Sequence, residues 1–522
     1  MKIKKLFNFP WLLISFILAV CAASIFRALR EVWVFYTPNM KFLGGAPGLF
    51  VILICNIAFI TALLIYNSYS KTELPDNKLL KTVVIISWVI TGLSVIAAAA
   101  IAVFNGAQTN SVMLMYLKRD LTVIIPFVAL ILLLISVGKL TGKARIAVIS
   151  AALAALSAVL IIKVFPLKDI KISSDPCVMD TGENYSVVFS TNRTGTAYIK
   201  YSYNGKEYKI YEQESGRRMT DRRIHSIAVP YDHLNNNEYS IGTTRVTDDY
   251  SYGSRLGKTA EKGPYEFKRF TGEYQKYLVI SDWHSYLKKA LSAIAYQDKY
   301  DAVILLGDPA AGMDFEEEAV RYIVEFGGAL TNGKIPVIYV RGNHETRGSF
   351  AAYMPEYLGY NKLYYTVDRG PYSFIILDSG EDKEDSHIEY GGLDDYAVNR
   401  NEMVDWLETV SVSNEKIICL CHAWQVSEPE ENLSLKAWDI LNILGVDFML
   451  SGHTHECRFI DGANDREKEQ IEKYPDIPVY IDGGYSDGKY IASAISLSPD
   501  EVKFEAYDNS GNKVMDKTIP WD

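Results

Sequence analysis

Cysteine is scarce in this sequence, with 6 residues among 522, which excludes a small scaffold held together by disulfides. Positive charge is scarce after residue 166, where 38 Lys or Arg face 59 Asp or Glu for a net charge of −21. Nucleic-acid phosphates are bound by stripes of Lys and Arg, so no nucleic-acid binding is expected. Disorder is also excluded, because 49% hydrophobic and 12% aromatic residues can bury a core.

The first third of the chain lacks charge altogether over long stretches. Residues 1–166 hold only 15 Lys or Arg and 4 Asp or Glu, and five stretches have no charged side chain: residues 6–26, 42–70, 82–117, 121–138 and 146–162. About 20 apolar residues span a bilayer as a helix. We therefore predict an α-helical transmembrane bundle of about five helices over residues 1–166, with the first helix retained rather than cleaved as a signal peptide.

The loops between these stretches predict the orientation of the chain. Nine Lys or Arg lie on the side of the N-terminus and five on the other side, which places the N-terminus in the cytoplasm. Five crossings then place residues 167–522 outside the cytoplasm, at the plasma membrane. No ionisable side chain lies inside a predicted span, so the bundle is expected to be an anchor in contact with membrane lipid rather than a transporter.

Residues 167–272 are predicted to form an all-β sandwich of the immunoglobulin or fibronectin kind. Short alternating runs are separated by turn residues at intervals of roughly 8–12 residues. Asn204-Gly205 between two such runs is typical of a hairpin. The stretch over residues 225–242 resembles the fibronectin type III-like domain that precedes the catalytic domain in purple-acid-phosphatase-type proteins.

Residues 273–522 have the pattern of an α/β domain. Apolar strands are expected at 277–281, 302–306, 336–340, 374–377, 417–421, 446–450 and 479–481, with helical spacing between several of them. The apolar runs are continuous rather than alternating, which is typical of sheets covered on both faces.

Residue types that bind metals follow five of these strands. The motifs are Asp282-Trp283-His284, Gly307-Asp308, Gly342-Asn343-His344-Glu345, His422 and Gly452-His453-Thr454-His455. Each motif alone is weak, but five of the six His in this part of the chain fall in them. Residues i and i+2 of a strand point the same way, so D-x-H and H-x-H can each direct two groups at one centre.

This order of motifs resembles the calcineurin-like metallophosphoesterase family over roughly residues 275–510. The resemblance implies a four-layer fold, with two β-sheets between helices and two metal ions at the strand ends. It implies one ion bound by Asp282, His284, Asp308 and His455, and a second bound by Asp308, Asn343, His422 and His453. Asp308 would then bridge the two ions, which could be divalent or trivalent manganese, iron or zinc.

Two metal ions suit phosphate ester hydrolysis, because they hold the phosphate oxygens, acidify a water molecule and neutralise the charge that develops. The resemblance implies an in-line attack by a hydroxide that the two metals activate, without a covalent enzyme intermediate. His344 is not assigned as a ligand. It is expected to be catalytic, giving a proton to the leaving oxygen or stabilising the transition state.

Two departures from the family pattern argue against the purple acid phosphatase and protein phosphatase subgroups. Purple acid phosphatases place a metal-binding Tyr three residues after the bridging Asp, and protein phosphatases place there an Asp that orients the catalytic His, whereas this chain has Ala311. Purple acid phosphatases also lack the His of D-x-H, which is His284 here.

The acidic runs 381–384 and 428–431 are interpreted as solvated loops. Four residues beside the motifs either line a substrate pocket or have structural roles: Trp283, Arg347, His387 and Trp424.

The sequence therefore predicts a membrane-anchored, metal-dependent phosphoesterase that cleaves a phosphate mono- or diester of a phosphorylated small molecule or a lipid-linked substrate. Three alternatives are a catalytically inactive metal-binding receptor or sensor, a transporter with an accessory domain, and adhesion through the sandwich. Every ligand position of the family is filled and His344 is present, which favours the hydrolase over the inactive receptor.

Overall fold

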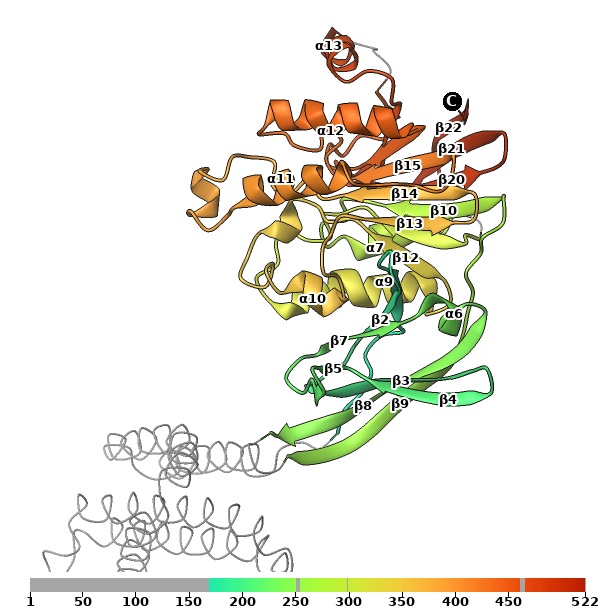
Figure 1. Cartoon of the computed structure of the whole chain (residues 1–522), viewed down its shortest axis with the longest axis vertical. Helices are drawn as coiled ribbons and strands as arrows, with labels where there is room; N and C mark the ends of the chain where they lie inside the picture. The colour runs from blue at the N-terminus through green and yellow to red at the C-terminus, as the bar shows by residue number, and fades with distance from the viewer. Residues whose placement is uncertain (1–168, 250–253, 298, 461–464, 522) are drawn as a thin grey trace, which may run out of the picture. The chain divides into compact units, whose positions relative to one another are not determined.

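The structure, a computed structural model, describes residues 169–249, 254–297, 299–460 and 465–521. The predicted membrane spans within residues 1–166 lie outside the described residues. Within the described ranges, no helix combines the length and the apolar character needed to cross a bilayer. Residues 168–246 and 256–522 form one compact unit, whose helices and strands are shown in Figure 1.

The larger sheet of this unit runs through both the β-rich and the α/β parts. Its strands lie in the order β22 (Lys513–Pro520), β21 (Glu501–Asp508), β20 (Lys489–Leu497), β10 (Gln275–Ile280), β11 (Ala302–Leu305), β12 (Pro336–Tyr339), β1 (Cys177–Asp180), β2 (Tyr185–Ser190) and β7 (Ile224–Val229), with β19 (Gly484–Ser486) paired to β20. Strands β10, β11 and β12 are parallel, so their carboxyl ends meet at one edge.

A second sheet packs against the first. Its order is β13 (Tyr365–Arg369), β14 (Tyr372–Leu377), β15 (Lys416–Cys421), β16 (Phe448–Ser451), β18 (Val479–Ile481) and β17 (Arg458–Phe459). Strands β14, β15, β16 and β18 are parallel, so the second sheet also gathers its carboxyl strand ends at one edge.

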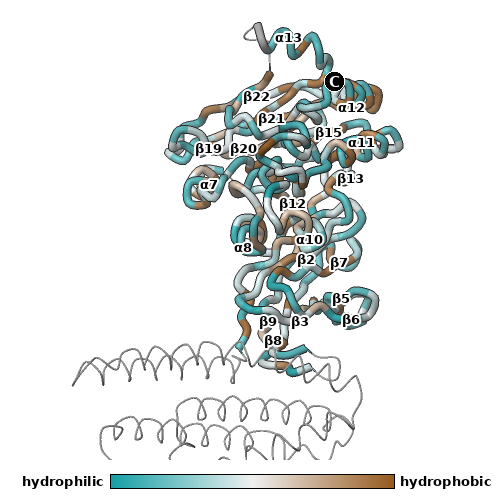
Figure 2. Tube along the Cα trace, turned by 90° about the vertical axis from the view of Figure 1, so that its left-hand side faces the viewer, coloured by the Kyte–Doolittle hydropathy of each residue, from teal (hydrophilic) through white to brown (hydrophobic). Residues whose placement is uncertain are grey.

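Helices cover the outer faces of these two sheets (Figure 1). Alternate residues of the second sheet, such as Phe374 and Ile418, face the core between the sheets, and their neighbours Ile375 and Cys419 face the helices. The helices are α7 (Leu287–Ile294), α8 (Glu316–Ala319), a π-helical turn (Val320–Val324), α9 (Glu325–Thr331) and α10 (Met354–Leu358) beside the first sheet, and α11 (Tyr396–Leu407) and α12 (Glu431–Leu444) on the second. Helix α13 (Asp465–Lys473) is mostly hydrophilic (Figure 2). The four-layer α/β arrangement is as predicted.

The β-rich part is built differently from the predicted separate sandwich. A third sheet, β4 (Lys206–Tyr211), β3 (Gly195–Tyr203), β8 (Asn237–Asp248) and β9 (Arg255–Phe267), packs against β1, β2 and β7 through one hydrophobic cluster. However, β1 also pairs in parallel with β12, with Val178 opposite Pro336.

Strands β1 and β2 therefore belong to both the β-rich part and the α/β part. Val178 and Val187 face the third sheet, whereas Cys177 and Val188 belong to the core of the α/β part. Because β1 and β2 are buried on both faces, the predicted boundary at residue 272 falls between two regions that share one sheet. The fibronectin type III-like character of this region stays a prediction.

Candidate metal centre

The eight residues singled out as ligands or catalyst all follow parallel strands at their carboxyl ends. Asp282 follows β10, Asp308 follows β11, and Asn343 with His344 follows β12 of the first sheet. His422 and His453 follow β15 and β16 of the second sheet. The two sheets thus bring side chains more than 170 residues apart in the sequence into contact, such as Asp282 and His455.

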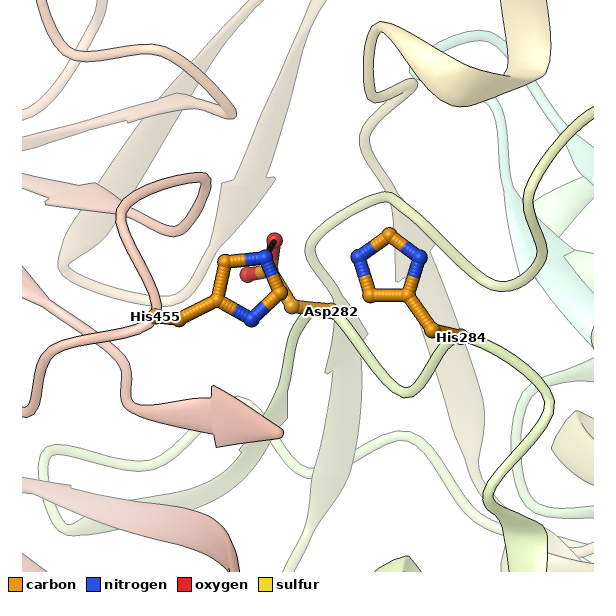
Figure 3. Close-up of side chains that lie close together, drawn as sticks. All are labelled: Asp282, His284 and His455. Carbon is orange, nitrogen blue, oxygen red and sulfur yellow. Dashed lines mark ion pairs between the residues drawn. The ribbon is translucent and has the colours of Figure 1, made fainter. Parts of the chain in front are cut away.

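Three potential ligands form the first group, Asp282, His284 and His455, whose ligand atoms all lie within 4.8 Å of one another. Nε2 of His455 lies 3.6 Å from Oδ1 of Asp282, and the rings of His284 and His455 stack with their centroids 5.0 Å apart. Figure 3 shows the carboxylate of Asp282 beside the ring of His455, with His284 facing them from the loop after β10. One cation could contact all three.

Asp308 stands at the centre of the remaining ligands. Its Oδ2 lies 3.2 Å from Nε2 of His422 and 3.8 Å from Nε2 of both His284 and His344. Nε2 of His422 is in turn 3.9 Å from Oδ1 of Asp282. Asp308 also groups with His422 and His453 within ligand distance. A carboxylate placed between two groups in this way can bridge two cations.

Asn343 directs its amide oxygen at other acceptors. Oδ1 of Asn343 lies 3.1 Å from Nδ1 of His453, and the oxygen faces only acceptor atoms, Oδ2 of Asp308 among them. The opposite amide orientation would satisfy those acceptors with hydrogen bonds. A cation between them favours the inward oxygen instead, because carboxylate, amide and imidazole lone pairs then share it.

Several buried atoms at the centre have no hydrogen-bond partner within the described part of the chain. They include Oδ1 of Asp282, Nε2 of His284 and Nε2 of His422. Buried polar atoms are costly to leave unpaired, by about 1–3 kcal/mol each. All three atoms belong to predicted ligands, so the donor set fits a cation rather than a hydrogen-bonded network.

Backbone carbonyls hold the imidazole rings in position. Nδ1 of His422 bonds to the carbonyl of Leu306 at 2.6 Å, and Nδ1 of His455 bonds to that of Tyr485 at 2.5 Å. These contacts place the proton on Nδ1 and leave Nε2 free to bind a metal. His453 is reversed, because its Nε2 lies 3.5 Å from Oε1 of Glu428 and its Nδ1 faces Asn343.

His344 contacts a backbone carbonyl at the position where protein phosphatases are expected to use an Asp side chain. Its Nδ1 lies 3.0 Å from the carbonyl oxygen of Ala311, and its Nε2 points toward Asp308. The sequence indicated that Ala311 removes the group that orients this histidine. The carbonyl of the same residue makes the contact, which a sequence motif does not reveal.

Two buried carboxylates that the motifs left without a role support the ligand loops. Glu345 accepts the backbone N–H groups of Asp308 and Gly342 at 3.0 and 3.2 Å, and burial and the nearby Asp308 raise its pKa to about 8. Asp482 accepts the N–H and hydroxyl of Ser281, the residue before Asp282. Asp482 directly follows β18, so the strand-end rule that selected Asp308 could also have selected it.

The electrostatic field at the centre favours positive charge. Burial lowers the pKa of His422, but the carboxylates of Asp308 and Asp282 outweigh this effect and raise it to about 10. Burial alone would raise the pKa of Asp308, yet His422 and His344 hold it well below its usual range. Carboxylates that retain a proton on a buried imidazole would also stabilise a cation in its place.

The backbone at the centre is strained. Asp282, His284, Asp308, His453 and His455 all have positive φ, from 36° to 70°. Such conformations cost roughly 1 kcal/mol or more for residues other than glycine and gather at functional sites. Glycines give the ligand loops the space they need: a Cβ on Gly342 would lie 2.2 Å from Oδ1 of Asp308.

The four residues beside the motifs that could line a substrate pocket differ in their surroundings. Trp283 is buried and bonds to the carbonyl of Tyr322, and Trp424 is buried among other aromatic rings, so both have packing roles. His387 is exposed at the start of a short helical turn. Arg347 forms a two-pronged ion pair with Glu381 beside the centre.

The interpretation of the acidic runs as solvated loops is wrong for Glu381, whereas Glu384, Glu428 and Glu431 are exposed as interpreted. Glu381 is only 1% exposed, because it pairs with Arg347. In the second run, Glu428 contacts His453 and Glu430 pairs with the buried Arg400. A local charge pattern cannot show that a partner from another strand end will bury a carboxylate.

Comparison with known proteins adds one family match. Residues 275–457 match the model of the family described as calcineurin-like phosphoesterase. No curated protein matches this chain.

Similar solved structures include a conserved uncharacterised protein from Streptococcus pneumoniae described as a predicted phosphoesterase, at 15% identity and a TM-score of 0.23 over 47% of this chain and 98% of the other. A phosphoesterase from E. coli matches at 14% identity and a TM-score of 0.23 over 47% and 100% of the two chains. A cold-active protein-tyrosine phosphatase from a psychrophilic Shewanella species matches at 11% identity and a TM-score of 0.24 over 66% and 100%.

The family match and the side chains gathered at the strand ends agree. Residues 275–457 are a calcineurin-like phosphoesterase domain, and the chain is a hydrolase that acts on phosphate ester bonds.

Proposed function

We propose that this chain is a membrane-anchored phosphoesterase with a binuclear metal centre. Residues 1–166 would form the anchor, as their uncharged stretches predict, and the β-rich and α/β parts would lie outside the cytoplasm. The substrate would be a phosphate mono- or diester of a small molecule or a lipid.

The ligand groups described above support two cation positions that would share Asp308. The first position would use Asp282, His284, Asp308 and His455, and the second would use Asp308, Asn343, His422 and His453. Two bound cations would supply Lewis-acid stabilisation of the phosphate charge and lower the pKa of a water molecule. Imidazole, carboxylate and amide donors suit manganese, iron or zinc.

His344 has the geometry of a general acid. Its ring is about a quarter exposed, and Nε2 points toward the centre while Nδ1 is held by the carbonyl of Ala311. An imidazolium in this place can give its Nε2 proton to the leaving oxygen, and it adds positive charge where the transition state is most negative.

One observation carries the proposal: the unpaired buried atoms of Asp282, His284 and His422 converge on the space around Asp308. Unpaired ligand atoms support a bound cation, and His344 beside them favours hydrolysis over an inactive metal-binding receptor. The same convergence supports two cations rather than one, because Asp308 lies in one group of potential ligands with His284 and in another with His422 and His453.

The test uses the full chain, purified in lipid nanodiscs with added manganese. We expect two cations per chain and hydrolysis of a chromogenic phosphomonoester or diester. His344→Ala should lower turnover by about 10²–10⁴-fold with the metal content unchanged. Asp308→Ala should lose bound metal.

His233→Ala, which changes a histidine of the β-rich part that contacts Tyr201 and Tyr203, is the matched control and should leave both values unchanged. Two bound cations without hydrolysis of any ester in a broad panel would favour a receptor instead. Labelling of cysteines introduced into exposed loops of residues 169–521, from outside intact cells, tests the location. Protected sites would reverse the proposed orientation.

A further inference from the structure

Large apolar side chains are exposed on the loops around His344. Phe315 is 70% exposed, Tyr353 59%, Ile388 89% and Leu393 91%. They lie on three loops, after β11, after β12 and after β14, which start from the same strand ends as the ligands. Two of these loops lead into α10 and α11. Both helices lie on the left-hand side of the described part in Figure 1, and this side faces the viewer in Figure 2.

Hydrogen bonds fix these loops to one another. The N–H of Met313 donates to the carbonyl of Arg347 at 2.7 Å, and the N–H of Phe350 donates to the carbonyl of Met313 at 2.9 Å. Arg347 pairs with Glu381, which also accepts the hydroxyl of Tyr390 at 2.7 Å. Tyr390 lies between Ile388 and Leu393 in the sequence, so the third loop is tied to the first two.

The same loops hold the proposed acid. Ala311, in the first loop, accepts Nδ1 of His344, and Arg347 of the second loop follows His344 by three residues. A general acid acts on the leaving oxygen, so the leaving group of the ester lies on the side of His344. The exposed apolar side chains are therefore on loops that border the leaving group.

Two cationic side chains of this rim, Arg347 and Lys383, are already paired. The guanidinium of Arg347 contacts both Glu381 and Asp382, and Lys383 contacts Asp382 and Glu389. The rim thus offers apolar contact more than positive charge. Single exposed apolar residues are common on protein surfaces, but here four lie on loops that are fixed beside a catalytic group.

The sequence supplies an independent reason for an apolar partner. Five uncharged stretches within residues 1–166 predict that the enzyme is held at a bilayer, where amphiphilic phosphate esters concentrate. Building on the proposed function, we propose that the substrate is an amphiphilic phosphate ester whose leaving group is an apolar chain that contacts Phe315, Tyr353, Ile388 and Leu393.

The reaction is a simple hydrolysis. A water oxygen forms a new bond to phosphorus, the bond from phosphorus to the ester oxygen breaks, and the alcohol departs with the proton that His344 gives to it. His344 is reprotonated from water, so no oxidant, reductant or further co-reactant is needed.

The test is a chain-length series with the full chain in nanodiscs. Monoalkyl phosphates and the matching methyl alkyl diesters, from one to eight carbons, remain soluble, and release of the alcohol gives kcat/KM. For the wild type we expect kcat/KM to rise roughly two- to fourfold for each added methylene, as expected for partial to full burial of the chain. The double variant Ile388→Ser/Leu393→Ser should flatten this rise.

Ile443→Ser is the matched control. Ile443 is 83% exposed and lies near the carboxyl end of α12, which leads into the start of β16 and not into its ligand-bearing end. Its variant should keep the full rise of kcat/KM with chain length. The inference would be overturned if kcat/KM of the wild type did not change with chain length. It would also be overturned if the double variant showed an equal rise, because partition into the bilayer alone would then explain it. Either result leaves the phosphoesterase proposal intact. Failure to cleave any ester, the methyl ester included, would overturn the proposed function itself.

Discussion

Gly342→Ala tests the geometry of the metal centre without removing any ligand. A Cβ at this position would lie 2.2 Å from Oδ1 of Asp308 and 2.6 Å from its backbone nitrogen. Reaching ordinary contact requires roughly 1 Å of displacement. Rotation of the Asp308 side chain cannot relieve the clash with its backbone nitrogen, so the loop that carries the bridging carboxylate must move.

The expected effect is large because Asp308 belongs to both cation positions. A 1 Å misplacement costs about 10²-fold in rate, and a disturbed ligand shell costs about 10- to 100-fold in metal affinity. Overpacking should also lower the free energy of unfolding by about 1–3 kcal/mol. Titration of manganese by calorimetry, kcat/KM for a chromogenic ester and thermal unfolding measure the three effects.

Gly312→Ala provides the control at a nearby glycine. A Cβ there would meet the carbonyl oxygen of Arg347 at 3.5 Å, an ordinary contact, so metal affinity and rate should stay within about twofold of the wild type. If Gly342→Ala also kept both values within twofold, the placement of Asp308 between two cations would be refuted.

Three further predictions concern the surroundings of the centre. Glu428→Gln should weaken binding of the second cation by about tenfold, because Glu428 contacts Nε2 of His453, a proposed ligand of that cation. A two-site metal titration measures this effect, and an equal loss of affinity at both sites would contradict the role. Glu430→Gln should destabilise the protein at pH 7 by about 1–2 kcal/mol, since Glu430 pairs with the buried Arg400. Burial raises the pKa of Glu430, but its bonds to Arg400 and Ser427 outweigh this and lower it, so the stabilisation is present above the unfolded pKa of about 4.3 and is lost as the pH falls through the folded value. The difference in melting temperature between wild type and variant should therefore shrink as the pH falls below the unfolded pKa, and a constant difference would refute the pairing. Residues 273–522 alone should fail to fold, whereas residues 169–522 should fold, because β1 covers the edge of β12; sharp near-ultraviolet circular dichroism from the shorter chain would contradict the shared sheet.

The ligand residues were accessible from the sequence because each one follows an apolar run. Asp282, Asp308 and His422 stand directly after buried strands, and parallel strands end at a common edge. The residues that contact the ligands and their loops were harder to predict from the sequence. Glu428 and Glu381 look like solvated charges in the sequence, and only the loops that meet at the strand ends give them His453 and Arg347 as partners.

The domain arrangement shows a similar limit. Alternating runs predict the strands of the β-rich part, but strand pairing is not encoded locally. Val178 opposite Pro336 joins segments more than 150 residues apart, and a separate sandwich and a shared sheet have the same local pattern.

By itself, the sequence determined which side chains could bind metal, in what order they follow the strands, and that the first third is uncharged over lengths suited to a bilayer. The tertiary structure alone decided that the carbonyl of Ala311 contacts Nδ1 of His344 and that Phe315, Tyr353, Ile388 and Leu393 are exposed. The physical reason is that strand ends and periodicity are local properties of the chain. Hydrogen bonds between loops, burial of carboxylates and the approach of backbone to backbone depend on residues that are distant in the sequence.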